Sequence, residues 1–210
     1  MKNLLHVGCG VLNIKSLPSY FQDGGWAEVR VDIDLNVRPD IVAEIQDLSI
    51  IESSTIEAIY SSHNIEHVWE HEVPIVLKEF HRVLVRFGFA VILCPDILSV
   101  SQAIVNDDID TLLYESGAGP IRPIDVLYGH GAAIASGRHY MAHKTAFTAT
   151  SLARHILDAG FSRAYIVRDK YFGLHAVAFK ESSDLNESEV IAAALMPSSA
   201  EIIEAKSYLA

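Results

Sequence analysis

The stretch that most constrains this chain is a short apolar run, residues 4–7, that ends abruptly in Gly8-Cys9-Gly10. This ending is typical of a buried parallel strand that delivers its chain to a ligand. Glycine lets the backbone take positive φ and has no Cβ to hold a ligand away. A second β-rich run ends in Asp32, at about the twenty-residue spacing that separates a nucleotide-binding turn from a ribose-binding carboxylate. A tight strand exit without a ligand is the alternative reading of the glycine pair alone.

Strand-like and helical segments alternate along most of the chain. We expect further strands near 40–43, 58–62, 89–94, 164–167 and 175–179, and helices near 73–84 and 148–160. This alternation predicts an α/β fold with a mostly parallel sheet. The last two strands are close enough in sequence to pair antiparallel. The connection after the second strand is too short for a full crossover helix, unlike that of an ordinary doubly wound fold.

Composition narrows the class of partner. The chain has 210 residues, is 50% hydrophobic and carries a formal net charge of −11. This charge disfavours nucleic acid as the main partner, because phosphate binding needs clustered Lys and Arg. No apolar run reaches the ~20 residues of a membrane helix, and the N-terminus enters a strand without a signal peptide. We therefore expect no membrane partner. Cys9 and Cys94 are the only cysteines, which indicates a cytoplasmic protein with free thiols.

Two segments depart from the strand–helix alternation. Residues 97–146 form a long connection, and its part 117–146 holds several glycines and histidines with few charges. A long connection inside a domain is typical of a lid or binding loop. Residues 183–210 predict a C-terminal helical appendage, with helices near 190–195 and 200–209. Docking onto the domain or contact in a homodimer is the role we expect for it.

Several short motifs occur in a characteristic order, which is more specific than any one of them. They are Val7-Gly8-Cys9-Gly10, Val31-Asp32-Ile33-Asp34, Ser62-His63-Asn64-Ile65-Glu66-His67, Glu79-Phe80-His81-Arg82-Val83-Leu84 and the segment from Ala142 to Phe161. Together they resemble the class I S-adenosylmethionine (SAM)-dependent methyltransferases, most closely the methyltransferase type 11 group. The resemblance implies a Rossmann-like three-layer sandwich with a mostly parallel seven-stranded sheet and an antiparallel last strand. It assigns residues 1–182 to a SAM-binding domain in which 97–146 shape the acceptor site.

The resemblance also implies a cofactor site at the strand ends. The residues expected to bind SAM are Gly8, Cys9, Gly10, Asp32, Ile33, Glu44, Ile45, Ser62 and His63. Backbone N–H groups of the glycine turn would approach the methionine end of the cofactor. Asp32 would accept the ribose hydroxyls, Glu44 would reach the adenine edge, and His63 would line the sulfonium.

The implied reaction is methyl transfer to a small-molecule or sugar-like acceptor. Removal of a proton from a hydroxyl or amine acceptor is helped by a base, and histidine is suited because its pKa lies near neutrality. Among His63, His130, His139 and His143 we favour His143, then His63, as the catalytic group. No metal site is predicted, because no pair of histidines has a ligand spacing supported by cysteine or carboxylate.

Two other functions remain open from the sequence. An NAD-type oxidoreductase would use the same glycine turn and Asp32, but its fingerprint places glycine at position 13, where this chain has Asn13. A non-catalytic SAM-binding relative on the same fold is the other alternative, because fold does not determine function. Asn13 and the short segment after the second strand keep this reading open.

Overall fold

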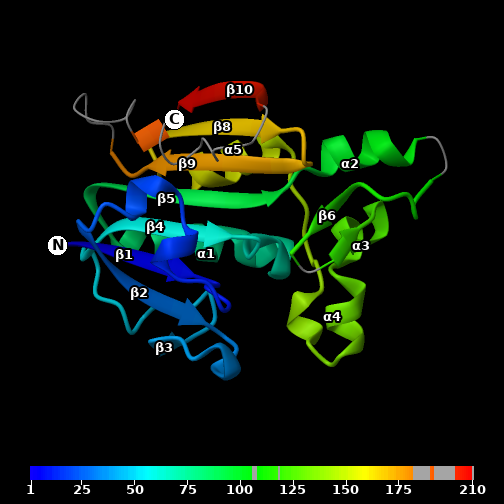
Figure 1. Ribbon diagram of the computed structural model, residues 1–210. Helices are drawn as coiled ribbons and strands as arrows, with labels where there is room; N and C mark the ends of the chain where they lie inside the picture. Colours follow the sequence, from blue (N-terminus) through cyan, green and yellow to red (C-terminus); the bar gives the residue numbers. More distant parts are fainter. Residues whose placement is uncertain (106–107, 118, 182–189, 192–201, 210) are drawn as a thin grey trace.

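The computed structural model describes residues 1–105, 108–117, 119–181, 190–191 and 202–209. One mixed eight-stranded sheet runs through the molecule in the order β10-β8-β9-β5-β4-β1-β2-β3 (Figure 1). Its strands are β1 (Lys2–Val7), β2 (Trp26–Asp32), β3 (Ile41–Val42), β4 (Ile56–Ser62), β5 (Leu84–Pro95), β8 (Arg163–Asp169), β9 (Gly173–Phe179) and β10 (Ile202–Leu209). Within these residues, every helix is too short or too polar to cross a membrane.

The five strands from β3 to β5 are parallel neighbours. β9 runs antiparallel to β5, and β8 runs antiparallel to β9. The mostly parallel α/β sheet and the antiparallel pair of late strands are therefore confirmed. Val7 pairs with Val31 on one side and with Ser61 on the other, so β1, β2 and β4 have their carboxyl ends side by side at one end of the sheet. Open sheets of this kind bind ligands at the carboxyl ends of their strands.

The two faces of the sheet are covered unequally. The amphipathic helices α1 (Val73–Val83) and α5 (Ala149–Asp158) pack on one face and join the larger hydrophobic core. The other face is covered by two short 3-10 turns, η1 (Ile14–Ser16) and η2 (Ser19–Phe21), and by the helical residues 190–191. The fold is a three-layer sandwich in which one helical layer is thin.

The short connection after the second strand is confirmed. A single 3-10 turn, η3 (Leu35–Val37), links β2 to β3. Arg38 follows in the left-handed conformation, with φ of 52°, which reverses the chain into β3. β3 itself has only two residues, so the sheet ends there in a short edge strand, which limits the unpaired backbone available to other chains.

The described residues between 97 and 146 form a cap at the end of the sheet where β4 and β5 terminate (Figure 1). The cap consists of α2 (Ile97–Ile104), β6 (Tyr114–Ser116), β7 (Gly119–Ile121), α3 (Pro123–Tyr128), α4 (Gly131–Ala135) and η6 (His139–Met141). Asp96 caps the first of these helices by accepting from Leu98 N. The cap lies beside the strand ends, where a lid is expected. The role of the cap as a lid stays a prediction.

The predicted helix near 200–209 is wrong for residues 202–209, which form β10 paired antiparallel with β8. The sheet therefore has eight strands rather than seven. The edge of β8 offers unpaired backbone groups that another extended segment can satisfy, and Tyr208 packs against the core from that position. Of the other predicted helix, 190–191 are helical. The remainder of it and the boundary at 182/183 lie outside the described residues.

Candidate functional site

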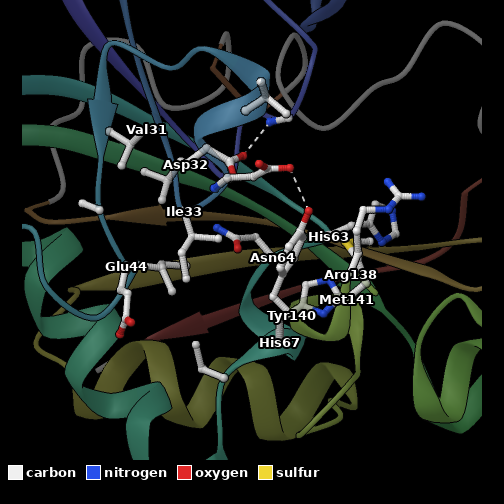
Figure 2. Close-up of a pocket in the computed structure, with 18 of the residues that line it drawn as sticks. Val31, Asp32, Ile33, Glu44, His63, Asn64, His67, Arg138, Tyr140 and Met141 are labelled. Atoms are coloured by element: carbon white, nitrogen blue, oxygen red, sulfur yellow. Dashed lines mark hydrogen bonds between the residues drawn. The ribbon is translucent and has the colours of Figure 1, made fainter. Parts of the chain in front are cut away.

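A cavity of about 430 Å³ opens at the carboxyl ends of β1, β2 and β4 (Figure 2). Seven residues predicted for the cofactor site line it: Gly8, Gly10, Asp32, Ile33, Glu44, Ile45 and His63. Glu44 is exposed at its rim and Ile45 is buried in its wall. The strand ends thus gather residues from separate parts of the sequence into one concave surface.

The glycine turn after β1 is held to β2 by its backbone. Gly8 N and Cys9 N donate to Val31 O at 2.9 and 3.2 Å, and Gly10 N donates to Asp32 Oδ2 at 2.7 Å. We expected these N–H groups to face the cofactor; instead they are occupied within the protein. The turn shapes the cavity wall and positions Asp32.

Two side chains of β2 reinforce this turn. The Arg30 guanidinium donates to the carbonyls of Gly10 (2.7 Å) and Leu12 (3.0 Å). It also donates to the carbonyls of Val37 in η3 and of Arg38 directly after it. Glu28 accepts from Ile14 N at 2.8 Å and from His6 Nδ1 at 2.8 Å. Burial lowers the pKa of His6, although Glu28 opposes the shift. The loop is therefore fixed before any ligand binds.

Asp32 keeps part of its hydrogen-bonding capacity free. Its Oδ1 accepts from Asp34 N at 2.9 Å and its Oδ2 from Gly10 N, so a carboxylate with about four lone-pair sites retains two. Asp34 is tied to the cap, because Tyr140 Oη donates to Asp34 Oδ2 at 2.8 Å (Figure 2). This bond closes one side of the cavity.

The exit of β4 brings a different kind of polar group to the cavity. His63 has a positive φ of 50°, and Asn64 lies directly over the glycine turn. A Cβ on Gly8 would lie 2.5 Å from Asn64 Cγ, so only glycine fits beneath it. Asn64 Nδ2 is buried and has no hydrogen-bond partner in the described part of the chain. It is a donor that a bound molecule could satisfy.

A second cavity, of about 150 Å³, is also lined by His63 and lies at the end of β5 and the start of β9. The cap contributes Tyr114 to it, and the sheet contributes Asp169 and His175, whose Oδ2 and Nε2 are 2.7 Å apart. Burial alone would raise the pKa of Asp169, but hydrogen bonds from His175, Gly173 N and Tyr171 N outweigh it, and this pKa is lowered. His63 is thus shared by two adjoining cavities.

Several solved structures are similar to this chain in fold. A SAM-dependent methyltransferase from Methanosarcina mazei superposes with a TM-score of 0.56 at 15% identity, over 86% of this chain and 93% of its own. One from Archaeoglobus fulgidus gives 0.55 at 12% identity, over 85% and 86%. The 1,6-didemethyltoxoflavin-N1-methyltransferase of Burkholderia thailandensis, solved with 1,6-didemethyltoxoflavin and S-adenosylhomocysteine, gives 0.52 at 15% identity, over 86% and 71%.

This chain has the fold of the class I SAM-dependent methyltransferases. At these identities the likeness concerns the fold alone. No protein-family model matches the sequence, and neither does any curated protein.

Three residues predicted for the methyltransferase-fold site lie outside the large cavity formed by the described residues. Cys9 is buried beneath the turn, and burial raises the pKa of its thiol to about 11. Ser62 is half-buried and lies two residues after Tyr60 in β4, so the two side chains share a face of the sheet. That face is the opposite, thinly covered one. His143 lies behind the β4 exit, where its Nδ1 is 2.7 Å from Val126 O.

His143 belongs to a polar cluster in which Glu66 is buried and the two histidines, His67 and His143, are half-buried. Burial lowers the pKa of His143. Burial by itself would raise the pKa of Glu66, but His63, His67 and His143 outweigh it, and this pKa is lowered. The Glu66 carboxylate in turn raises the pKa of His63, against desolvation, at a distance of 3.4 Å between Nδ1 and Oε1.

Other residues of the cavity were not predicted from the sequence. Among them are Asn64 and His67 from the β4 exit and Arg138, Tyr140, Met141 and Lys144 from the cap. Asn64 lies in the motif 62–67 and could have been predicted from its place directly after β4. The cap residues carry no spacing signal, because the path of the cap over the strand ends brings them there.

Proposed function

We propose that this protein is a SAM-dependent methyltransferase that acts on a small molecule. The observation that carries the proposal is the pair of cavities that adjoin at His63, at the sheet edge where open α/β folds bind ligands. The larger cavity would hold the cofactor and the smaller one the acceptor. Methyl transfer requires two molecules in line and in contact, which this arrangement offers.

The lining of the larger cavity suits the parts of SAM. Asp32 has lone pairs left for the ribose hydroxyls, and Ile33 and Ile45 offer apolar surface for adenine. Because the N–H groups of the glycine turn are occupied, the methionine carboxylate needs other donors. The unpartnered Asn64 Nδ2 and the cation of Arg138 are suited to that task.

The chemistry asked of the protein is mainly positioning and exclusion of water, because positive sulfur already activates the methyl carbon. SAM supplies that methyl group when it is bound. His63 is the base we propose for acceptor proton removal, since it lines both cavities and Glu66 stabilises its protonated form. His143 is less suited to this role because it lies outside both cavities.

The oxidoreductase alternative loses support at Asn13. Asn13 is the N-cap of the three-residue turn η1, and its Oδ1 accepts from Lys15 N at 3.0 Å. A dinucleotide pyrophosphate is bound at the N-terminus of a full helix after the first strand. A short 3-10 turn held by Glu28 offers no such terminus.

The test is calorimetric titration of the protein with SAM, S-adenosylhomocysteine and NAD in parallel. We expect both adenosyl ligands to bind one per chain and NAD not to bind. Asp32→Asn should weaken binding about 10- to 100-fold, because it removes a charge-assisted hydrogen bond to the ribose. Glu44→Gln tests the adenine end, and Glu52→Gln, at an exposed carboxylate outside the cavity, is the matched control.

Failure of both adenosyl ligands to bind at millimolar concentration would refute the proposal. Thermal unfolding of Asp32→Asn is measured alongside, because Asp32 also holds the turn. Turnover is then followed as release of S-adenosylhomocysteine with hydroxyl, amine and sugar acceptors. Tight binding without turnover on any of them would favour the non-catalytic alternative.

A further inference from the structure

Three side chains with metal-ligating atoms meet behind the β4 exit. One carboxylate oxygen of Glu66 and one ring nitrogen each of His67 and His143 lie within 4.8 Å of one another. The two rings are 4.9 Å apart between centroids. In a tetrahedral site with bonds of about 2.1 Å, ligand atoms lie roughly 3.4 Å apart. Side-chain rotations on the order of 1 Å would therefore close these three atoms around one ion.

The Glu66 carboxylate has an unmet requirement. Its residue is 1% exposed, and neither oxygen has a hydrogen-bond partner among the described residues. The distance of 3.4 Å to His63 Nδ1 is longer than a good hydrogen bond. A buried carboxylate requires pairing or a bound cation. A void of about 10 Å³ touches both Glu66 and His143, which is about the room that one water or ion occupies.

Both histidines have the outer contact to a backbone carbonyl that metal-binding histidines commonly make. His67 Nδ1 lies 3.2 Å from Ala142 O, and His143 Nδ1 lies 2.7 Å from Val126 O. A carbonyl oxygen only accepts, so each Nδ1 carries the proton and each Nε2 keeps its lone pair. A backbone carbonyl that fixes the tautomer in this way is the usual outer partner of a metal-bound imidazole.

Backbone bonds hold the two contributing segments together. Glu66 and His67 are neighbours in η4 (Ile65–His67). Lys144 N and Thr145 N both donate to Glu66 O, at 2.9 and 3.2 Å, and clamp the returning cap segment against η4. The positions of the three side chains are thus set by the fold and do not depend on a long flexible loop.

We propose that Glu66, His67 and His143 bind one divalent transition-metal ion, with zinc preferred. Two imidazoles and one carboxylate suit zinc, whereas calcium and magnesium take oxygen ligands. Three protein ligands leave a fourth position for water or for an oxygen of a bound molecule, as in catalytic rather than structural zinc sites. No metal site was predicted from the sequence, because the cap separates His143 from the other two ligands along the chain.

The experiment uses the whole chain without an affinity tag, freed of metal by a chelator and titrated with Zn²⁺ against a chromophoric competitor. No cofactor is added, so the result is independent of the proposed methyl transfer. We expect one zinc per chain. Cobalt in place of zinc should produce the visible absorption of a tetrahedral ion, and zinc should raise the melting temperature of the protein.

Glu66→Gln and His143→Asn should each weaken zinc binding by at least the roughly 10- to 100-fold that loss of an outer partner causes. His71→Asn, at an exposed histidine of the neighbouring turn, is the matched control and should not change it. Circular dichroism checks that each variant folds. If a variant does not fold, the cobalt spectrum of the wild-type protein tests the proposal instead. Absence of stoichiometric zinc, or binding unchanged in both ligand variants, would overturn the proposal in favour of a buried network neutralised by a protonated histidine.

Discussion

The turn after β1 and the turn after β4 both line the same cavity. They differ in whether their polar groups have hydrogen-bond partners within the protein. In the first, Gly10 N and Asp32 are bonded to each other, and the backbone of Gly8 is bonded to β2. In the second, Asn64 Nδ2 and both oxygens of Glu66 lack hydrogen-bond partners within the described residues. The first turn is complete without a ligand, whereas the second is not.

The difference has an energetic meaning. A buried polar group without a partner costs about 1–3 kcal/mol, and more if it is charged. Native proteins leave few of them, and each one calls for an explanation. The turn after β1 therefore serves as scaffold, and the turn after β4 is where bound groups would complete the bonding. The following changes test that division, in order of decreasing expected effect.

Gly8→Ala should damage both turns together. Its φ of +67° costs a residue with a Cβ about 1–2 kcal/mol, and the new Cβ would lie 2.5 Å from Asn64 Cγ. We expect a loss of about 3 kcal/mol in the free energy of unfolding, measured by urea denaturation. Gly10→Ala, with φ of +52° and open space around the Cβ, should lose only the strain. Equal losses in the two variants would contradict the packing of Asn64 on Gly8.

Glu28→Gln should weaken the scaffold turn alone, by about 1–2 kcal/mol. Burial lowers the pKa of His6 below its ordinary value of 6.5, and the Glu28 carboxylate opposes the shift. The variant should therefore lower this pKa further, as measured by NMR titration of the ring. Because the folded pKa is depressed, the contribution of His6 to stability is complete above about pH 6.5 and is lost as the pH falls through the folded value. An unchanged titration would show that the two side chains are not coupled.

Asn64→Ala should separate stability from binding. Removing an unsatisfied buried donor should change the free energy of unfolding by less than about 1 kcal/mol. S-adenosylhomocysteine should nevertheless bind about tenfold more weakly, because its carboxylate loses a donor. Calorimetry and urea denaturation on the same preparation measure both. A variant that is destabilised but binds normally would place Asn64 with the scaffold.

Tyr140→Phe should have the smallest effect. It removes only the bond between the cap and Asp34 Oδ2. We expect S-adenosylhomocysteine to dissociate about 2- to 10-fold faster, with little change in the association rate, as measured by stopped-flow fluorescence. Tyr128→Phe, at an exposed tyrosine of the cap, is the matched control. Equal rates in the wild type and in Tyr140→Phe would mean that the cap does not retain the ligand.

The sequence by itself was sufficient for the parallel half of the sheet and for the residues that end its strands. Strand periodicity and the glycines after β1 are local signals, and parallel strands bring their carboxyl ends together automatically. Gly8, Gly10 and Asp32 were identified from these signals, and His63 from the family resemblance; all four line the cavity.

Only the tertiary structure decided the rest. Residues 202–209 could form a helix by local pattern, but the free edge of β8 made them a strand. The bond of Tyr140 to Asp34 and the meeting of His143 with Glu66 join segments that are far apart in the chain. Such contacts depend on how the cap folds over the strand ends, which no local spacing records.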